Sequence, residues 1–325
     1  MTTDAENVLR RLLRRLPEAL RWRWHRYRHQ AALARRFGLV YYARWMTQRT
    51  WAWLLTRVAA RTAYVTLSPA AAAHRRRSDT VFIFGSGYSL NDLTPGEWAR
   101  VAEHDVFGFG GFIYQRWVRV DFHLLRSWDP TPESVYRWPR TTRTFATLLE
   151  ANPRFHDAVS VVQTEHSGIF ANTMIGLRLL PRGSRLLAYW TARRLSDAPS
   201  RRWRDGIVHA QGALVDCVNV AYLLGWKHIV LIGVDLYDHR YFWAPPDATM
   251  DFDDDGNLTR LTPEQANGSR WHDTHLSARR GVVELLAGWG REFARDGVTL
   301  SVYNPRSLLA EVLPVYERSG VAVTR

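Results

Sequence analysis

The stretch ALVDCVNVAYLLGWKHIVLIGVDLYD, residues 213–238, indicates the fold class most clearly. Its first half places apolar side chains on one helical face, at Leu214, Val218, Ala221 and Tyr222. Gly225 is a natural helix C-cap, and the apolar run 229–232 that follows it indicates a buried strand. A helix that leads directly into a strand is the repeating unit of an α/β protein with a parallel sheet.

The same alternation extends in both directions along the chain. Thr94, followed by Pro95 and Glu97, predicts a helix start, because Thr caps, Pro suits the first turn and Glu closes a capping box. The predicted fold is α/β: a Rossmann-like, mostly parallel sheet with helices on both faces, preceded by an all-helical N-terminal arm. Ligands of such sheets bind beyond the carboxyl ends of the strands. The further elements predicted are strands at 81–84, 105–112 (with its loop), 120–125 and 298–304, and a helix over 281–297.

A loop rich in glycine and serine ends the strand at 81–84, within VFIFGSGYSLNDL. It reads Gly85-Ser86-Gly87 and continues to Ser89. A glycine has no side chain to hold a phosphate away from backbone N–H groups, and serine hydroxyls add donors. The pattern fits neither the dinucleotide fingerprint nor the P-loop, which needs a lysine after its last glycine. Phosphate binding and a plain tight turn therefore both stay open from these residues alone.

The composition limits the class of protein. The chain has 325 residues, 46% of them hydrophobic, and 15 tryptophans, which suits one large core or two modest ones rather than disorder. Its single cysteine, Cys217, excludes an internal disulfide and a cysteine-rich zinc site. Arginines interrupt the apolar stretches near the N-terminus, so we expect neither a signal peptide nor a membrane span, and we expect an intracellular protein.

The positive charge is concentrated in the N-terminal segment. The chain carries a formal net charge of +13, and residues 1–77 hold 17 of its 44 basic residues but three of its 31 acidic ones. That segment alone therefore carries +14, and the remainder carries −1. Leucines at helical spacing, mixed with Trp and Tyr, predict helices here, and residues 68–79 resemble a linker. We divide the chain into a basic, aromatic-rich helical arm with its linker, 1–77, and a folded α/β domain, 78–325.

Three roles suit this arm. Arginine stems and aromatic rings both favour the headgroup layer of an anionic membrane, so residues 1–70 would bind such a surface. The arm would otherwise pack on the α/β domain with a solvated arginine face, or neutralise the phosphates of a nucleic acid. We favour the membrane surface, expect no nucleic-acid partner, and leave the oligomeric state open, a homo-oligomer included.

Three ordered motifs carry a resemblance to a known family. VFIFGSGYSLNDL (81–93), HIVLIGVDLYDHRYF (228–242) and LSVYNPRSLLAEVLP (300–314) together resemble the bacterial sialyltransferases of glycosyltransferase family 42. They also resemble the MptE-like and motility-accessory, flagellin-glycosylating proteins, which share the glycine loop and the GVDL strand end. The resemblance covers residues 80 to about 315 and leaves the arm unexplained.

The resemblance implies a glycosyltransferase of defined chemistry. Such an enzyme takes a nonulosonic acid from a CMP-activated sugar donor, inverts the anomeric centre, and requires no metal or other cofactor. The acceptor would be a glycan or glycolipid. The protein would then be cytoplasmic and peripheral on the inner face of the cell membrane, and residues 78–325 would be a nucleotide-sugar-binding catalytic domain.

The resemblance also implies site residues. Tyr237 and Tyr241 would hold the departing phosphate, and a histidine in a lid around 242–280 would be the general base, with His275 favoured and His272 the alternative. Neutral tyrosine hydroxyls suit charge stabilisation, and a histidine with a pKa of about 6.5 suits proton removal at neutral pH. No residue is assigned to a metal. The donor contacts fall on loops at strand ends: Gly85, Ser86, Gly87, Ser89, Gly110, Arg126, Gly212, Asp235, Asn304, Pro305 and Ser307.

Two positions depart from the family pattern. Gly110 or Gly111 stands where an asparagine is usual, and Arg126 replaces a second asparagine. An arginine there would still pair with a phosphate or a sugar carboxylate. Because both positions would contact the donor, the transferred sugar stays open among sialic acid, pseudaminic or legionaminic acid, and Kdo.

An acidic stretch, DFDDDGNLTRLT at 251–262, raises the question of a metal. Asp251, Asp253 and Asp255 match the first half of a calcium loop, but Thr262 stands where a glutamate is needed. Asp251 and Asp253 also mimic the DxD motif of other nucleotide-sugar transferases. We interpret the stretch as an acidic, solvated turn and leave metal binding open.

Two other functions are alternatives to the transferase. The first is an MptE-like pterin diphosphokinase, which would use ATP and Mg²⁺ and would make the acidic residues metal ligands. The second is a nucleic-acid-binding or scaffold protein.

Overall fold

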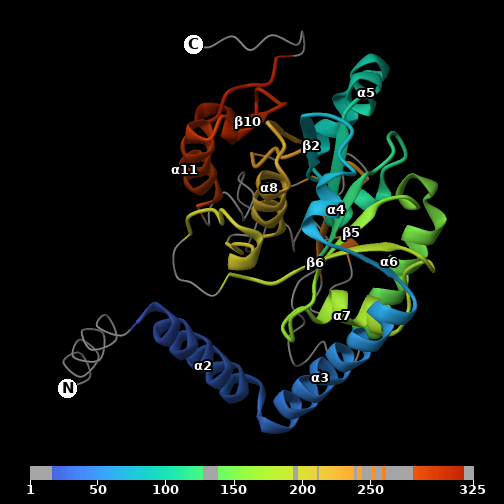
Figure 1. Cartoon of the computed structure of the whole chain (residues 1–325), viewed down its shortest axis with the longest axis vertical. Helices are drawn as coiled ribbons and strands as arrows, with labels where there is room; N and C mark the ends of the chain where they lie inside the picture. The colour runs from blue at the N-terminus through green and yellow to red at the C-terminus, as the bar shows by residue number, and fades with distance from the viewer. Residues whose placement is uncertain are drawn as a thin grey trace.

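The computed structural model describes residues 17–126, 138–192, 197–210, 212–237, 240–243, 250–252, 258–260 and 281–317. An eight-stranded sheet lies at its centre, and all neighbouring strands in it are parallel (Figure 1). In chain order the strands are β1 (Val65–Leu67), β2 (Thr80–Phe84), β3 (Asp105–Phe109), β4 (Phe122–Leu125), β5 (Val159–Gln163), β6 (Arg185–Tyr189), β7 (His228–Ile232) and β10 (Thr299–Val302).

The strand order creates a switch point beside β2. Across the sheet the order is β1-β6-β5-β4-β3-β2-β7-β10. From β2 the chain builds outward on one side as far as β6, and then returns to place β7 and β10 on the other side. β2 and β7 pair directly, with Val81 opposite Ile229 and Phe84 opposite Ile232. Such a reversal leaves a crevice at the carboxyl ends of the two strands, where α/β proteins bind ligands.

Helices, short 3-10 turns and one small hairpin complete the described chain. Among the described residues, no helix combines the length and the apolar character needed to cross a membrane. The hairpin strands are β8 (Met250–Phe252) and β9 (Leu258–Arg260). The 3-10 turns are η1 (Tyr88–Asp92), η2 (Gly110–Tyr114), η4 (Pro153–Phe155), η5 (Trp203–Asp205) and η6 (Leu308–Glu311). The helices are α2 (Glu18–Phe37), α3 (Leu39–Thr62), α4 (Pro69–Ala73), α5 (Pro95–Ala102), α6 (Trp138–Ala151), α7 (Ile169–Gly176), α8 (Ala213–Leu224) and α11 (Val282–Arg295).

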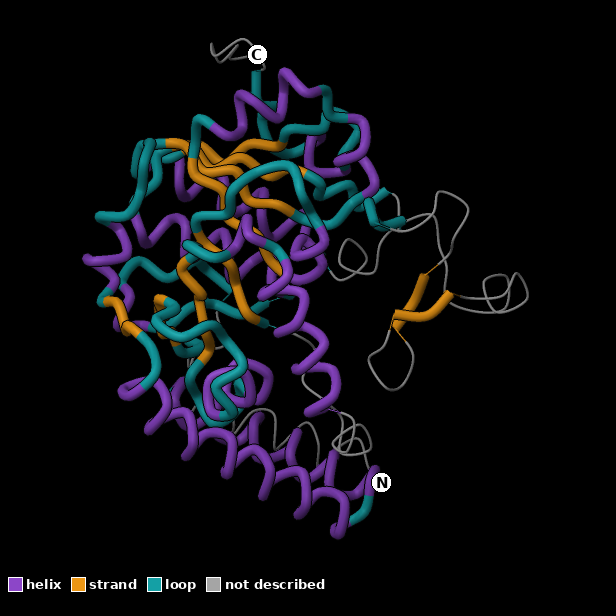
Figure 2. The backbone as a smooth tube through the Cα atoms, turned by 90° about the vertical axis from the view of Figure 1, so that its right-hand side faces the viewer, coloured by secondary structure: helices purple, strands orange, loops and turns teal. Residues whose placement is uncertain are grey.

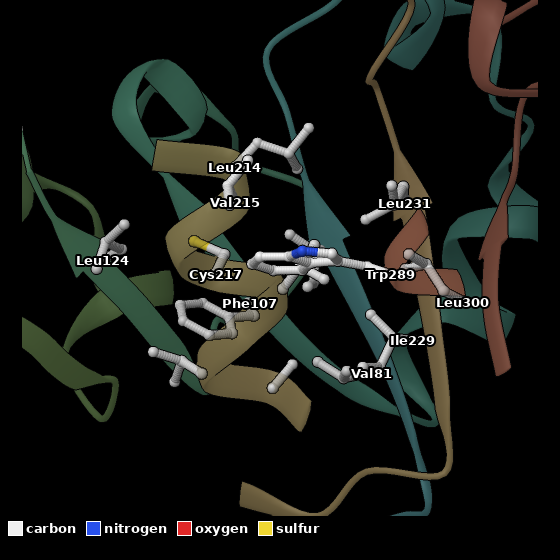
Figure 3. Close-up of a cluster of buried hydrophobic side chains, with 14 of the residues drawn as sticks. Val81, Phe107, Leu124, Leu214, Val215, Cys217, Ile229, Leu231, Trp289 and Leu300 are labelled. Atoms are coloured by element: carbon white, nitrogen blue, oxygen red, sulfur yellow. The ribbon is translucent and has the colours of Figure 1, made fainter. Parts of the chain in front are cut away.

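Both faces of the sheet are covered (Figure 2). Val81 and Ile83 of β2 point into a buried cluster shared with α8 and α11 (Figure 3). Phe82 and Phe84 point to the opposite face, into a cluster shared with α5, α6 and α7. All five residues of β2 are buried, as expected for a parallel strand between two helical layers. The predicted α/β fold, with helices on both faces of a parallel sheet, is confirmed.

Two predicted helix ends are confirmed in detail. The Thr94 hydroxyl accepts the Glu97 N–H at 3.3 Å while the Glu97 carboxylate accepts the Thr94 N–H at 2.8 Å, which completes the capping box of α5. Gly225 ends α8 with a φ of 88°, in the left-handed region that glycine adopts most readily. These caps fix where the helices begin and end, and therefore where the loops at the sheet edges lie.

The N-terminal helices are joined to the sheet by direct packing. α3 buries Trp45, Arg49, Thr56 and Ala59, and it packs along α7. Gly176 of α7 permits close approach, because a Cβ there would lie 2.9 Å from the Leu55 Cβ. β1 then pairs with β6, so it lies inside the segment expected to be arm and linker. Dividing the chain at residue 77 stays a prediction, but α3 and β1 are packed as parts of the α/β layers.

Candidate active site

Two loops interlock at the switch point, one after β2 and one after β7. The Gly85 N–H donates to the Ile232 carbonyl at 2.8 Å, and the Gly87 N–H donates to the Gly233 carbonyl at 2.8 Å. A Cβ on Gly85 would lie 2.3 Å from the Gly233 carbonyl oxygen, so a larger residue would push the loops apart. Both glycines are therefore required by loop-on-loop packing, whatever else binds there.

Asp235 joins the loops that follow β2, β7 and β10. It is buried, and its Oδ2 accepts the Ser89 N–H at 2.9 Å while its Oδ1 accepts the Ser89 hydroxyl. Oδ1 also accepts Nδ2 of Asn304, at 3.0 Å. A Cβ on Gly87 would lie 2.4 Å from Oδ2, so glycine is needed here as well. Four predicted site residues thus meet at one carboxylate, which acts as the hub of the three loops.

The loop after β10 is held by its own polar side chains. The Ser307 hydroxyl donates to the Val234 carbonyl at 2.6 Å, and the same oxygen accepts the Leu309 N–H as it caps η6. The Asn304 Oδ1 accepts the Arg306 N–H at 3.0 Å. Asn304 and Ser307 are both buried, so they position the loop in the structure as it stands.

The two predicted tyrosines lie on the rim of this hub. The Tyr237 hydroxyl accepts Nδ2 of Asn304 at 3.3 Å, and Tyr241 forms an isolated β-bridge with Gly87. Two arginines that sequence reasoning missed lie near. The Arg306 guanidinium lies 5.9 Å from the centre of the Tyr237 ring, and the Arg240 guanidinium lies 4.2 Å from that of Tyr88. Phenol and guanidinium groups together suit an anionic ligand at this rim.

The segment 240–243 covers the loop after β3. The Phe242 N–H donates to the Ser86 carbonyl at 3.1 Å, and the Tyr241 and Trp243 rings stack at 4.6 Å. Trp243 lies directly on Gly111, where a Cβ would come within 2.1 Å of the indole. The neighbouring Gly110 has a φ of 54°, which also favours glycine. Of the two glycines at this position, Gly111 thus makes room for a tryptophan, and Gly110 permits the turn of the backbone.

Arg126 takes part in a second cluster, at the carboxyl ends of β4 and β6. It follows β4 directly, and its Nη1 lies 2.6 Å from Oδ2 of Asp216 in the first turn of α8. The Tyr189 hydroxyl at the end of β6 donates to the same Oδ2 at 3.0 Å. On the other carboxylate oxygen, Nδ1 of His209 lies 2.7 Å away. Gly212, the N-cap of α8, has a φ of 116°, which favours glycine.

Electrostatics keep this carboxylate charged although it is buried. Burial alone would raise the pKa of Asp216, but Arg126 and His209 together hold that pKa below its ordinary value. Burial and the Asp216 charge raise the pKa of Tyr189 well above its ordinary value, so the phenol stays a neutral donor. Sequence reasoning missed Tyr189, His209 and Asp216, because each lies in a separate segment and none carries a motif.

Several predicted residues lie outside the described part of the chain. They are His272 and His275, most of the lid around 242–280, and Asp253 and Asp255. Asp251 is described as part of β8, where it pairs with Thr259. Among the described residues, no group of three or more His, Cys, Asp or Glu side chains is arranged to hold a metal ion.

Comparisons with known proteins find remote structural similarity. No family model matches the chain, and no curated protein matches its sequence. It is similar to the MAf glycosyltransferase of Magnetospirillum magneticum AMB-1, with 14% identity over 71% of this chain and 35% of that chain and a TM-score of 0.39. It therefore spans about a third of that protein's length. It is also similar to the monofunctional alpha-2,3-sialyltransferase Cst-I of Campylobacter jejuni, with 13% identity over 76% and 83% of the two chains and a TM-score of 0.41.

Proposed function

We propose that the protein is an inverting, metal-independent glycosyltransferase that moves a nonulosonic acid from a CMP-sugar to a glycan or glycolipid. One observation carries the proposal: the loops after β2, β7 and β10 meet at Asp235, at the switch point of a parallel sheet. These are the three loops whose motifs resemble the donor-binding segments of glycosyltransferase family 42. The position is also the one where α/β sheets bind nucleotides.

The rim of the hub supplies the groups that a leaving nucleotide needs. When the glycosidic bond of a CMP-sugar breaks, negative charge grows on the phosphate, so donors aimed at that charge accelerate the reaction. Tyr237 and Tyr241 take that role in the proposal, and the Arg240 guanidinium beside Tyr88 adds positive charge, whereas that of Arg306 is paired with Asp92 at 2.7 Å. In the proposal Asn304 and Ser307 lie on the cytidine side, and together with Asp235 they keep the loops in position.

The reaction requires one bond to form and one to break. The oxygen of the acceptor hydroxyl attacks the anomeric carbon, the bond from that carbon to the phosphate oxygen breaks, and CMP leaves with the electron pair. A base must take the hydroxyl proton, and general-base catalysis is typically worth about 10²- to 10⁴-fold in rate. His275 and His272 are the candidates that the family resemblance supplies, and both lie outside the described residues.

Nucleotide preference tests the proposed function. Thermal denaturation should be followed with CMP, CTP, ATP and UDP, each with and without Mg²⁺, because a ligand that binds only the folded state raises its stability by mass action. CMP should raise the melting temperature in the presence of EDTA. Stabilisation by ATP with Mg²⁺ but not by CMP would favour the pterin diphosphokinase instead. No response to any nucleotide would favour the scaffold or nucleic-acid-binding protein.

We further propose that the N-terminal helices hold the enzyme on an anionic membrane surface at the cytoplasmic face. One face of α3 packs on α7, and the opposite face is exposed and mixes apolar with basic residues. Trp51, for example, is 63% exposed. Such a face suits insertion of rings and apolar side chains among headgroups while arginines pair with lipid phosphates. Its members are Val40, Arg44, Thr47, Trp51, Leu54, Val58 and Arg61.

Charge reversal on this face tests membrane binding without unfolding the protein. Arg44→Glu combined with Arg61→Glu should release the protein from vesicles of phosphatidylglycerol and phosphatidylcholine and leave CMP binding intact. Arg143→Glu combined with Arg154→Glu, two exposed positions elsewhere, is the charge-matched control and should stay bound. Equal release by both pairs would indicate a response to net charge only, and release by neither would remove the proposal. Deletion of residues 1–70 is less informative, because it removes α3 and β1 from the packed layers.

A further inference from the structure

A cavity of about 380 Å³ lies between the N-terminal helices and the carboxyl ends of β5 and β6. The helices contribute Arg26 of α2 and Trp53 of α3 to its lining. The sheet contributes Trp190, which directly follows β6, and residues 164–166, which directly follow β5. The volume lies in the range of pockets that bind small molecules. None of these residues belongs to the motifs that predicted the nucleotide site.

The cavity is separate from the loops that meet at Asp235. In the sheet order, β4 and β3 lie between β5 and β2. Strands lie about 4.8 Å apart, so the end of β5 is roughly 14 Å from the end of β2. Both ends belong to the carboxyl edge of one parallel sheet, the edge on which such sheets bind ligands. A group bound in the cavity therefore does not itself react at the nucleotide.

The loops after β5 and β6 hold Glu165 in place. Its Oε1 accepts the Thr191 N–H, and its backbone carbonyl accepts Nδ2 of Asn172 at 2.6 Å. The Thr164 N–H donates to the Tyr189 carbonyl at 3.1 Å, which joins the two loops. Oε2 of Glu165 accepts no hydrogen bond from the part of the chain that the structure describes. One carboxylate oxygen is therefore left to accept a hydrogen bond from a ligand.

His166 is held by α3 with its ring in one tautomer. The Thr50 hydroxyl donates its hydrogen to a backbone carbonyl one turn earlier in α3, so it accepts from Nε2 of His166, at 2.9 Å. Burial, with the charges of Arg49 and Arg26, lowers the pKa of His166, so at neutral pH the ring is neutral and Nδ1 keeps its lone pair. The Trp53 ring lies edge-to-face with this imidazole, with the two ring centres 6.1 Å apart.

This lining suits a sugar ring that carries a negative charge. An indole buries the apolar C–H face of a sugar, and Trp190 is 38% exposed. The Glu165 carboxylate and the neutral imidazole accept hydrogen bonds from sugar hydroxyls, and a guanidinium such as that of Arg26 pairs with a phosphate or a carboxylate. An acyl chain would offer no hydrogen bonds to the charged side chains that it buried, which is costly.

We propose that this cavity binds an acidic sugar, a ring that bears a phosphate or a carboxylate, through Arg26, Glu165 and the indoles of Trp53 and Trp190. In the transferase this sugar belongs to the acceptor glycan, at a position remote from the hydroxyl that reacts; this part rests on the proposed function. The acceptor itself then spans the roughly 14 Å between the strand ends. Because two of the four side chains come from α2 and α3, the N-terminal helices contribute to the choice of acceptor.

Direct binding to the full chain tests the site without any donor. Glucose 6-phosphate, glucuronate, glucose and inorganic phosphate should each be titrated, with binding followed by saturation-transfer NMR of the ligand. We expect at least one acidic sugar to bind about 10-fold more tightly than glucose or phosphate, because it combines a charge-assisted contact with burial of the ring. The two acidic sugars distinguish phosphate from carboxylate. Phosphate that binds as tightly as glucose 6-phosphate, or no binding of either acidic sugar, would overturn the proposal.

The arginine is tested with a matched pair of variants. Arg26→Gln should weaken the binding of the acidic sugar by about 10- to 100-fold and leave glucose binding unchanged. Arg26→Lys keeps the charge and should retain most of the affinity. Arg28→Gln, an exposed position two residues further along α2, is the control and should match the wild type. An equal loss of glucose binding in Arg26→Gln would assign this arginine to the structure of the cavity rather than to the anion, and would contradict the proposal.

The tryptophan is tested in the same way. Trp53→Leu should weaken all three sugars and leave phosphate unchanged, whereas Trp51→Leu, on the exposed face of α3, should have no effect. If Trp53→Leu does not fold, Glu165→Gln replaces it, because the amide keeps an oxygen for the loop but loses the charge that favours sugar hydroxyls. Sugar binding that is unchanged in the folded variants of both Arg26 and Trp53 would place the ligand elsewhere and overturn the proposal.

The outcomes separate this site from the function to which it is linked. If an acidic sugar binds and CMP does not, the cavity is a sugar site and its role toward the acceptor falls with the proposed function. If CMP binds and no acidic sugar does, the transferase stands and the cavity proposal is overturned. With CMP-N-acetylneuraminate as donor and phosphorylated oligosaccharides from lipopolysaccharide as acceptor, saturating glucose 6-phosphate should raise the KM for the acceptor only. An unchanged KM would contradict the acceptor role.

Discussion

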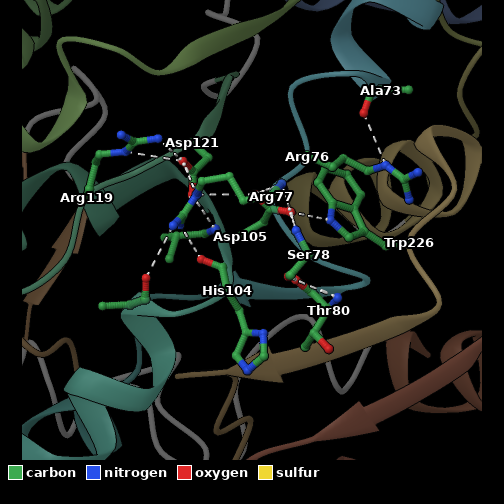
Figure 4. Close-up of polar contacts among 12 residues, drawn as sticks. Ala73, Arg76, Arg77, Ser78, Thr80, His104, Asp105, Arg119, Asp121 and Trp226 are labelled. Atoms are coloured by element: carbon green, nitrogen blue, oxygen red, sulfur yellow. Dashed lines mark hydrogen bonds and ion pairs between the residues drawn. The ribbon is translucent and has the colours of Figure 1, made fainter.

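The two ends of the sheet hold similar side chains in different arrangements. At the amino ends of β3 and β4, Arg77 joins Asp105 and Asp121 (Figure 4). Asp105 is fully buried and accepts the Arg77 N–H and, at 2.8 Å, the indole N–H of Trp226. Asp121 accepts Nη2 of Arg77 at 2.9 Å and Nη2 of Arg119 at 2.8 Å. This network connects the residues that precede β2 with the starts of β3 and β4.

The carboxyl ends also pair an arginine with a buried aspartate, but they add a histidine. Arg126 and Asp216 are the counterparts of Arg77 and Asp105, and His209 takes the second oxygen of Asp216. At the amino ends, backbone, indole and guanidinium groups donate hydrogen bonds to the oxygens of both carboxylates. These hydrogen bonds stabilise the fold. At the carboxyl ends one titratable ring keeps an exposed side. This difference favours the carboxyl ends as the place of the proposed chemistry, although both clusters pair an arginine with a buried aspartate.

The largest effect that we expect is on the pH dependence of the free energy of unfolding. It comes from His123, which lies on β4 between the two ends of the sheet. Its ring is buried without hydrogen bonds to either nitrogen, and burial lowers its pKa to about 3. The unfolded chain binds a proton below about pH 6.5, so the stability from the neutral ring is full above that pH and is lost as pH falls toward 3. The loss is on the order of 5 kcal/mol.

His123→Phe should remove most of this acid sensitivity, because a phenylalanine packs against Phe145 and Phe155 without titrating. Urea unfolding between pH 7 and pH 4 measures the effect. His156→Gln, an exposed position, is the control and should follow the wild type. Parallel pH curves for wild type and His123→Phe would mean that water or a polar group reaches the ring.

The next effect tests the amino-end network. Arg77→Ala removes the guanidinium that donates to the buried Asp121 and lies 3.7 Å from Asp105, while the backbone N–H of residue 77 still donates to Asp105. Because the Arg77 side chain is 36% exposed, we expect the cost to be that of one lost charged hydrogen bond, about 1–3 kcal/mol. The free energy of unfolding should fall by roughly that amount, while the CMP affinity of the folded protein stays unchanged. Arg75→Ala, two positions earlier and exposed, should cost little. A loss of CMP affinity in Arg77→Ala at a temperature where the protein is folded would show that the two ends are coupled.

The fold was predictable where the sequence carries long apolar runs with caps. β2, the α8–β7 unit and the α11–β10 unit belong to this class. β1, β5 and β6 were not predicted, because VTL, VSVVQ and RLLAY are short and carry polar residues at their ends. α7 is buried on nearly every side, so it shows no helical periodicity to detect.

The candidate site was predictable to the same degree. Gly85, Gly87, Asp235 and Asn304 follow strands directly, so a parallel sheet brings them to one edge, where they are found together. The sequence predicted Arg126 as a site residue, but it did not predict that Tyr189, His209 and Asp216 would lie around it. These residues meet only because β6 and β4 are separated by one strand and α8 begins above them, and that order is set by tertiary packing rather than by any local pattern.

A smaller effect, on kcat, distinguishes the tyrosines at the rim, Tyr237 and Tyr241, from Asp235, which joins the three loops. Tyr237→Phe or Tyr241→Phe removes one donor aimed at the leaving phosphate, so we expect kcat to fall by about 10²-fold, or about 2.7 kcal/mol, with little change in stability. Release of CMP from a CMP-sugar measures it. Tyr27→Phe on α2, where the ring is 67% exposed, is the control. A change in melting temperature without a change in kcat would assign these rings to packing.

The smallest effect compares the two buried aspartates directly. Burial raises the pKa of Asp105, whereas Asp216 titrates below its ordinary value because Arg126 and His209 favour its charge. On acidification Asp105 should take a proton first, which relieves the cost of its buried charge. The stability from Asp216 is full above the pKa of the unfolded chain and is lost as pH falls through its lower folded value. Carboxyl carbon-13 titration measures both, and the reverse order would contradict the comparison.

We infer that the carboxyl ends of β2, β7 and β10 bind the nucleotide while the amino ends only stabilise the fold. Hydrogen–deuterium exchange of the full chain, with and without CMP in EDTA, tests it most directly, because it reports both ends in one experiment. We predict slower exchange at 85–91, 234–243 and 304–309 on CMP binding, and no change at 102–107 and 118–123. Protection confined to the amino-end segments, or no protection at any of these loops under saturating CMP, would contradict the claim.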